Sequence, residues 1–242
     1  MSRAGRLAEA AATGLVGAAL GAGVGSLARL AAPAAVVAGA HGALSGWRRI
    51  YAWRRPSGPA AFVLDSTWSL PMTTAGLVGN VVGLAQRDGG YVAELSERAD
   101  RHVYRRGLAP RRGFATTLGP VIAGAGDTDD PRRRRLVIDH EDVHVWQARW
   151  LGPLFPVLYV GWTVVGGAIG GVLHLAGHRR DEPFARVVET SGYYLNPLEW
   201  WAYSRDGNWP PSGKVADLGW ARPACRPLAE VRADRGSRAA PS

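Results

Sequence analysis

The sequence contains one group of side chains suited to metal chemistry, the pattern His140-Glu141-x-x-His144. On a helix, side chains four residues apart lie on one face, so the two imidazoles would point at one place and could share a zinc ion. Glu141 would lie beside them as the general base for a water bound to that zinc. The plainer alternative is that the three side chains make ordinary hydrogen bonds on a helix.

A catalytic zinc site needs a third protein ligand, which this pattern does not contain. Gly and His do not follow His144 at the metzincin spacing, so the ligand must come from further along the chain. Glu199 is the first candidate, on a short helix predicted over 197–204. Alternatively, Glu199 completes a capping box with Asn196, which needs no metal. The remaining candidates are Glu189, His174 and His178.

Other polar side chains near the pattern could assist the reaction. Gln147 shares a helix face with His144 and could hydrogen-bond within the same pocket. Asp139 and Asp142 are expected to point away from that face, where they either meet solvent or take the second N–H of a ligand imidazole. A tyrosine could donate to an oxyanion that forms during hydrolysis, or simply pack. The candidates are Tyr193, Tyr194 and Tyr203, and Tyr203 is assigned the catalytic role because it shares a side of the helix with Glu199.

The helix that carries the pattern is predicted to run from about 131 to 151. Asp130 and Pro131 form a typical helix start, and Gly152-Pro153 a typical stop. Residues 132–135 are all arginine and lie against the helix dipole. Either nearby aspartates or lipid phosphates offset these charges, or the run is simply solvated.

The uncharged stretch 150–178 follows this helix and is long enough to span a membrane. It is predicted either as one long helix or as two short helices hinged at Gly166-Gly167. A single crossing would place Glu199 on the opposite side of the membrane from His140. The zinc hypothesis therefore requires this stretch to bring the chain back to the same side.

Residues 61–126, before the site helix, are predicted to be rich in short strands. Val, Ile, Thr and Phe favour this assignment, and Asp88-Gly-Gly90 is a turn signal. A helix is the alternative around 92–103. The predicted strands cover 61–65, 76–83, 91–95, 102–104 and 113–123.

Two further uncharged runs, 10–28 and 30–47, lie near the N-terminus. Glycines recur every four residues in the first run, a spacing that lets membrane helices approach closely. A membrane-embedded helical hairpin is the preferred interpretation, and a signal peptide or a soluble hairpin are the alternatives. Arginines flank both outer ends, so the positive-inside tendency places both ends in the cytoplasm.

Composition limits the partners of the chain. Its 242 residues carry a net charge of +9, almost all of it from arginine, since Lys214 is the only lysine. No nucleic-acid-binding module is visible, so anionic lipid headgroups near the arginine clusters are the expected partner, and nucleic acid is not. The single cysteine, Cys225, allows neither an intrachain disulfide nor a cysteine-based zinc site.

These patterns predict an α+β protein in three parts. Residues 1–55 form a helical hairpin that anchors the chain in the membrane. Residues 56–211, which begin with a linker at Pro56–Pro59, form an α+β domain with a zincin-like helical site region. Residues 212–242 form an irregular basic tail.

Three stretches together resemble a group of uncharacterised bacterial membrane-associated proteins with an HExxHxxQ…NPxExxA pattern, similar to minimal gluzincin-type zinc metallopeptidases. The resemblance covers about 110–205 and, more loosely, 40–110. It implies zinc on His140, His144 and Glu199, with Glu141 as the base. Asp142 occupies a position that is usually apolar in the group. The matching stretches are Phe114–Ile122, Asp139–Tyr159 and Asn196–Tyr203.

The function expected from the sequence is zinc-dependent hydrolysis at a bacterial inner membrane, with the main domain in the cytoplasm and a peptide or protein as substrate. The alternative is a membrane protein without enzymatic activity, in which the histidine pair or a metal has a structural role. A further alternative is an arginine-rich surface that binds anionic lipid.

Overall fold

The computed structural model describes residues 2–86, 89–109, 113–211, 215, 220 and 222–239. The chain is mostly helical, with a small three-stranded sheet, which agrees with the predicted α+β class. It divides into two compact units, Met1–Pro153 and Leu154–Ser242, and each is described by itself.

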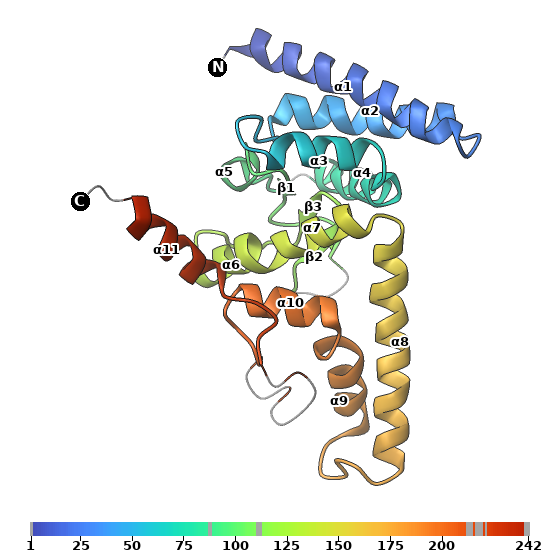
Figure 1. The fold of residues 1–242 in the computed structure, drawn as a ribbon, viewed down its shortest axis with the longest axis vertical. Helices are drawn as coiled ribbons and strands as arrows, with labels where there is room; N and C mark the ends of the chain where they lie inside the picture. Colours follow the sequence, from blue (N-terminus) through green and yellow to red (C-terminus); the bar gives the residue numbers. More distant parts are fainter. Residues whose placement is uncertain are drawn as a thin grey trace. The chain divides into compact units, whose positions relative to one another are not determined.

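The first unit begins with a tightly packed helical hairpin, α1 (Arg3–Ser26) and α2 (Ala31–Arg48), drawn in blue in Figure 1. Glycines let the two helices approach closely. A Cβ atom on Gly21 would lie 2.6 Å from the carbonyl oxygen of Ala34 and 2.7 Å from the Cβ of Ala38. The predicted N-terminal helical hairpin is therefore confirmed, and its small residues form the contact surface.

Two helices follow where strands were predicted, α3 (Ser57–Ser66) and α4 (Leu70–Ala85). The predicted strands at 61–65 and 76–83 are wrong, and so is the linker at Pro56–Pro59, because α3 begins at Ser57. The buried positions of α4 explain the error. They recur every three or four residues, as in a helix, but most are small or polar and give little hydrophobic signal. They are Met72, Thr73, Gly76, Gly79, Asn80 and Gly83.

The sheet has the strand order β1-β3-β2. β1 is parallel to β3, with His102 opposite Val121, and β2 is antiparallel to β3, with Thr117 opposite Ile122. The predicted strands at 102–104 and 113–123 are thus confirmed in shorter form. The strand predicted at 91–95 is replaced by the short helix α5, and the Asp88 turn lies outside the described residues. The bounds are α5 (Ala93–Ser96), β1 (His102–Val103), β2 (Thr116–Leu118) and β3 (Val121–Ala123).

The predicted site helix is present as three successive segments. Asp130 caps the first, because its carboxylate accepts a hydrogen bond of 2.8 Å from the backbone N–H of Arg133. The middle segment is a turn of π-helix, a feature that the sequence did not predict. The segments are α6 (Pro131–Arg135), η1 (Leu136–Glu141) and α7 (Asp142–Leu151).

The apolar core of this unit forms two clusters. One joins the sheet to the site helix, and the other lies beside the N-terminal hairpin. The first cluster contains Val92, Leu95, Val103, Ile122, Ala125, Val137 and Val145. The second contains Ile50, Tyr51, Ala61 and Phe62.

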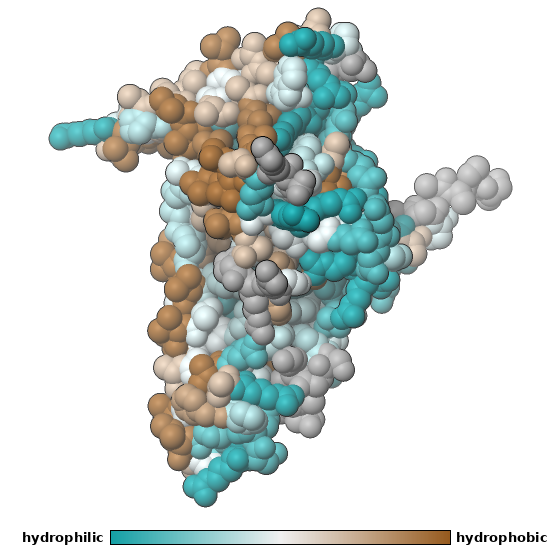
Figure 2. Space-filling view, turned by 180° about the vertical axis from the view of Figure 1, so that it is seen from behind, coloured by the Kyte–Doolittle hydropathy of each residue, from teal (hydrophilic) through white to brown (hydrophobic). Residues whose placement is uncertain are grey.

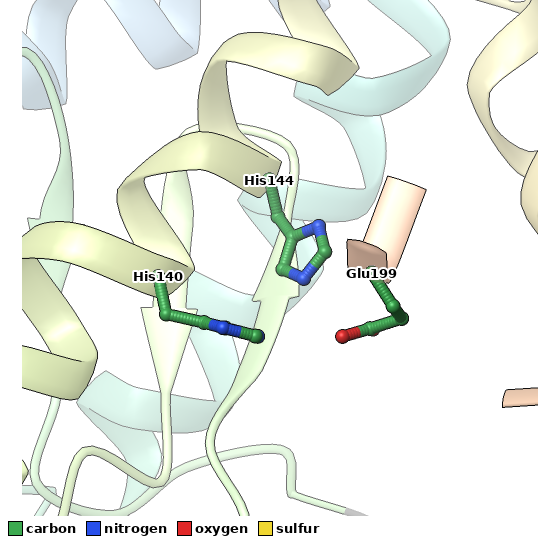
Figure 3. Close-up of side chains that lie close together, drawn as sticks. All are labelled: His140, His144 and Glu199. Carbon is green, nitrogen blue, oxygen red and sulfur yellow. The ribbon is translucent and has the colours of Figure 1, made fainter. Parts of the chain in front are cut away.

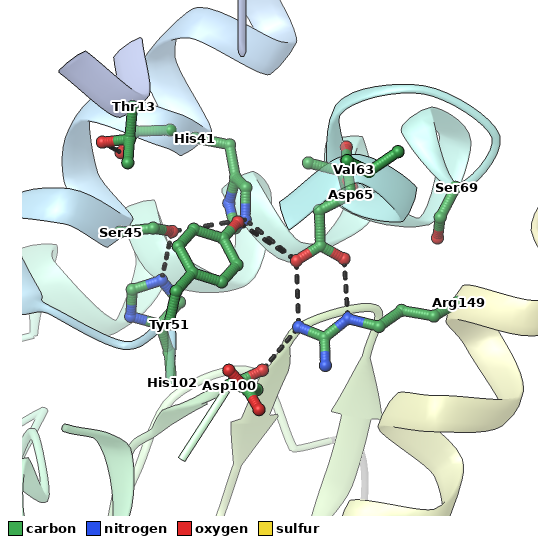
Figure 4. A network of polar contacts seen from close by, with 12 residues as sticks. Thr13, His41, Ser45, Tyr51, Val63, Asp65, Ser69, Asp100, His102 and Arg149 are labelled. Atoms are coloured by element: carbon green, nitrogen blue, oxygen red, sulfur yellow. Dashed lines mark hydrogen bonds and ion pairs between the residues drawn. The ribbon is translucent and has the colours of Figure 1, made fainter. Parts of the chain in front are cut away.

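A buried polar network lies beside the second cluster (Figure 4). Its centre is Asp65 of α3, which makes an ion pair with Arg149 of α7. Tyr51 donates a hydrogen bond of 3.2 Å to the Asp65 carboxylate, and Arg149 also donates to the backbone carbonyl of Asp100. The network thereby ties the C-terminal part of α7 to α3 and to the loop before β1.

Two histidines extend the network toward the hairpin. The hydroxyl of Ser45 lies 3.2 Å from Nε2 of His41 and 3.0 Å from Nε2 of His102. Both rings are completely buried.

The second unit is built around α8 (Leu154–Leu175), a single continuous helix. The hinge considered at Gly166-Gly167 is absent. The chain instead returns through α9 (Phe184–Glu189) and η2 (Thr190–Tyr194), which pack on the glycine face of α8. A Cβ atom on Gly166 would lie 2.6 Å from the carbonyl oxygen of Ser191.

The remaining helices are α10 (Pro197–Arg205) and α11 (Leu228–Ala239). The first was predicted almost to the residue. The second contradicts the prediction of an irregular tail over 212–242, because it gives that segment a regular helix.

Two helices, α1 and α8, are long and apolar enough to cross a membrane. Figure 2 shows hydrophobic side chains gathered along α8. The exposed apolar residues of that helix include Val157, Val160, Val164, Val165, Ile169, Val172 and Leu175.

Candidate metal centre

His140 and His144 lie on one face of the site helix, as the spacing predicts. Their rings approach edge to face, with centroids 5.0 Å apart, and both side chains are buried. His140 belongs to the last turn of η1, and His144 to the first turn of α7. The π turn therefore ends within the His-Glu-x-x-His pattern, and such turns are frequent at functional sites.

Gln147 fixes the orientation of the His144 ring. Its side-chain oxygen lies 2.8 Å from Nδ1 of His144. An amide oxygen only accepts, so this bond requires the proton on Nδ1, and the lone pair of the neutral ring then lies on Nε2. A neutral imidazole held in this tautomer is suited to binding a metal through Nε2. Gln147 was expected to share a face with His144 and to be able to hydrogen-bond within the pocket, and the structure shows such a bond.

Glu141 is buried beside the histidine pair, and β2 holds its carboxylate. The hydroxyl of Thr117 donates a hydrogen bond of 2.7 Å to Oε2 of Glu141. Nothing in the sequence pattern identified Thr117, because the contact depends on how the sheet meets the site helix. The remaining oxygen, Oε1, is the one that a substrate or water could use.

Asp142, the acidic residue in the third position of the pattern, has a local partner. It forms an ion pair with Arg101 from the loop before β1. The expectation that it points away from the histidines agrees with this contact. Asp139 was expected to be either a solvent-facing carboxylate or a partner of a ligand imidazole, and its burial contradicts the first alternative.

Glu199 lies in the first turn of α10 and is 2 % exposed. The helix is capped by Asn196, whose side-chain oxygen accepts a hydrogen bond of 3.0 Å from the backbone N–H of Leu198. The Glu199 carboxylate accepts a hydrogen bond from the hydroxyl of Tyr159 of α8. The Asn196 half of the predicted capping box is therefore present. The Glu199 carboxylate instead bonds to the Tyr159 phenol.

Two tyrosines near Glu199 stay protonated. Burial raises the pKa of the Tyr203 phenol above its ordinary value, and the Glu199 charge raises it further. The pKa of Tyr193 is raised by the same two effects. At neutral pH both phenols therefore keep their protons and can donate hydrogen bonds.

In the described part of the chain, His140, His144 and Glu199 form a group close enough to hold a metal ion (Figure 3). Each offers one ligand atom, and these atoms lie within 4.8 Å of one another. All three residues are buried. Two imidazoles and one carboxylate match the donors that zinc uses in hydrolytic sites.

The other candidate ligands are not part of this group. Glu189 lies in α9, and the ring of His174 packs edge to face against Phe184. His178 follows α8 in a turn. Of the functional neighbours, sequence reasoning missed Tyr159. Its phenol is one of the few polar groups in an otherwise apolar segment, and this isolated polarity could have identified it from the sequence.

The chain matches no protein-family model, no curated protein and no solved structure.

Proposed function

We propose that the protein is a membrane-associated zinc metallohydrolase of the peptidase type, with zinc held by His140, His144 and Glu199. The observation that carries the proposal is the gathering of three buried ligand atoms within 4.8 Å of one another. Zinc with three such ligands supplies a Lewis acid that keeps one coordination position open for water or a carbonyl oxygen. The peptide substrate class is proposed from the resemblance to gluzincins.

In this proposal each side chain of the site has a separate role in proton transfer, oxyanion stabilisation or positioning. Glu141 accepts a proton from the attacking water through Oε1, while Thr117 holds the other oxygen. Tyr203 donates to the oxyanion that forms on the substrate carbonyl. Tyr159 and Gln147 are positioning residues, because each orients a ligand side chain.

Membrane attachment is the second part of the proposal. Helices α1 and α8 have the length and apolar composition to enter a bilayer, and both expose large aliphatic side chains. Arginines at both outer ends of the hairpin favour a cytoplasmic location for those ends in a bacterial inner membrane.

Metal content and peptide hydrolysis test the proposal on the purified full-length chain. The wild-type protein should contain about one zinc per chain and hydrolyse a casein or mixed-peptide substrate. Glu141→Gln should retain the zinc and lose activity by about 10²- to 10⁴-fold. Zinc without any activity that depends on Glu141 would support the structural-metal alternative instead.

A matched pair of glutamate variants tests the third ligand. Glu199→Gln should lose zinc, whereas Glu189→Gln, a change of the same kind in the same unit, should retain it. Loss of zinc from the Glu189 variant alone would contradict the ligand assignment.

The lone cysteine offers a test of the membrane topology. Cys225 is half-buried and lies beyond α8 in sequence. In a bacterial host, a membrane-impermeant maleimide should label it in inverted inner-membrane vesicles and not in intact spheroplasts. Labelling in spheroplasts would place this part of the chain outside the cytoplasm.

A further inference from the structure

An arginine-lined cavity lies at the C-terminal end of α2, in the first unit. Its volume is about 530 Å³. Four of its six lining residues are arginines, contributed by the end of α2, the following loop and the segment before β1. The lining residues are Arg49, Ala52, Trp53, Arg54, Arg55 and Arg98.

Two of these arginines are already held in place by carboxylates. Arg98 makes a two-point contact with Glu9, at 2.5 and 2.7 Å, and Arg49 forms an ion pair of 2.6 Å with Glu97. Arg54 and Arg55 are exposed, and within the described part of the chain neither has an ion pair or a side-chain hydrogen bond. The cavity therefore has an excess of positive charge and two guanidinium groups ready for an anion.

An apolar groove of about 210 Å³ shares one wall with this cavity. The shared wall is Trp53, whose indole N–H donates to Glu9 at 2.8 Å and whose ring packs against Phe62. The groove is lined along α1 by Glu9, Ala12, Thr13 and Val16, and the Glu9 carboxylate is paired with Arg98. A ligand that fills both spaces must have an anionic end and an aliphatic end.

We propose that this composite site binds one anionic phospholipid. The phosphate contacts Arg54 and Arg55, and the start of an acyl chain lies in the groove beside Val16. The length of α1 supports a lipid as the occupant. From Glu9 to Ser26 the helix rises about 26 Å at about 1.5 Å per residue. This is close to the thickness of the hydrocarbon core, so the arginines lie at headgroup level when the hairpin is inserted.

The site rests on the membrane attachment proposed above and not on the metal centre. It can therefore fail while the metallohydrolase proposal stands, and the converse also holds. Zinc content measured on the same protein preparations separates the two.

Lipid binding can be measured by native mass spectrometry on the full-length protein in dodecyl maltoside. Dioleoylphosphatidylglycerol should bind as one tightly held molecule per chain. Dioleoylphosphatidylcholine, which has the same acyl chains but no net charge, should bind at least about tenfold more weakly. Inorganic phosphate at millimolar concentration should not displace the phosphatidylglycerol, because it cannot occupy the groove.

Three variants locate the site. Arg54→Gln with Arg55→Gln should weaken phosphatidylglycerol binding by about tenfold or more. Ala12→Trp, which fills the groove from an exposed position, should weaken it without removing a charge. Arg132→Gln with Arg135→Gln removes two exposed arginines of α6 and should change nothing. Thermal unfolding in the same detergent establishes that each variant is folded.

Equal binding of both lipids, or an unchanged affinity in the Arg54/Arg55 variant, would overturn the proposal. Displacement by inorganic phosphate would also overturn it, since the cavity would then be a site for free anions.

Discussion

The Asp65 carboxylate and the Arg149 guanidinium form a completely buried two-point ion pair, with N–O distances of 2.8 and 2.9 Å. Arg149 lies on α7, five residues after His144. Burial alone raises the pKa of Asp65, but the Arg149 charge and hydrogen bonds outweigh it and hold that pKa below its ordinary value. Both side chains therefore stay charged, and their attraction fixes the helix that carries the histidines.

Removing one partner of this pair should be strongly destabilising. Asp65→Asn leaves the Arg149 charge buried and should lower the free energy of unfolding by about 3–5 kcal/mol, measured by urea denaturation in detergent. Glu94→Gln, which breaks the exposed pair with Arg134, is the control and should cost less than about 1 kcal/mol. Equal effects of the two variants would mean that the buried pair contributes no more than a surface one.

The buried His102 should make stability depend on pH. Burial, followed by the nearby charges of His41, Arg48 and Arg149, holds the pKa of His102 well below its ordinary value of 6.5. The unfolded chain therefore binds a proton below about pH 6.5 that the folded chain does not. Stability is then greatest above pH 6.5 and falls as the pH is lowered, by up to about 1.4 kcal/mol per pH unit.

Replacing His102 removes this contribution. In His102→Gln the free energy of unfolding between pH 6.5 and pH 5 should change less steeply than in the wild-type protein. An identical slope in both proteins would show that His102 takes up its proton in the folded state.

The hydrogen bond from Tyr159 should strengthen metal binding. Tyr159→Phe removes the phenol that orients the Glu199 carboxylate and should weaken zinc affinity by about 10- to 100-fold in a chelator competition assay. Thr163→Val is the control, because that hydroxyl lies one turn further along α8 and donates to the backbone carbonyl of Tyr159. If both variants bind zinc like the wild-type protein, Tyr159 does not act through Glu199.

Tyr203 is expected to act on the substrate and not on the metal. Tyr203→Phe should keep the wild-type zinc content and lower kcat by about 10²-fold, with little change in KM. If KM rises by a similar factor while kcat stays unchanged, Tyr203 has a role in substrate binding instead.

The regular helices near the site could be predicted from local signals. Asp130-Pro131 and Asn196-Pro197 each combine a capping side chain with a proline in the first turn, and both helices begin there. The spacing of His140 and His144 was enough to predict one shared face. The N-terminal hairpin followed from its uncharged runs and its glycine spacing.

The incorrect secondary-structure predictions fall mainly where small or polar residues are buried. Gly76, Gly79 and Asn80 line the packed face of α4, so the hydrophobic pattern carried little helical signal and strands were predicted. The π turn at 136–141 adds a single residue to a helical turn. No known residue propensity predicts such an insertion from the local sequence. The Asp65–Arg149 and Thr117–Glu141 contacts join residues far apart in sequence, and pattern alone cannot pair them.

Zinc K-edge X-ray absorption on the purified protein tests the central claim most directly, because it reports the ligand atoms themselves. We predict two imidazole nitrogens at about 2.0–2.1 Å and carboxylate or water oxygen at about 2.0–2.2 Å, with imidazole scattering reduced in His140→Ala. A sulfur ligand at about 2.3 Å, or a zinc shell without imidazole, would contradict a site built from His140, His144 and Glu199.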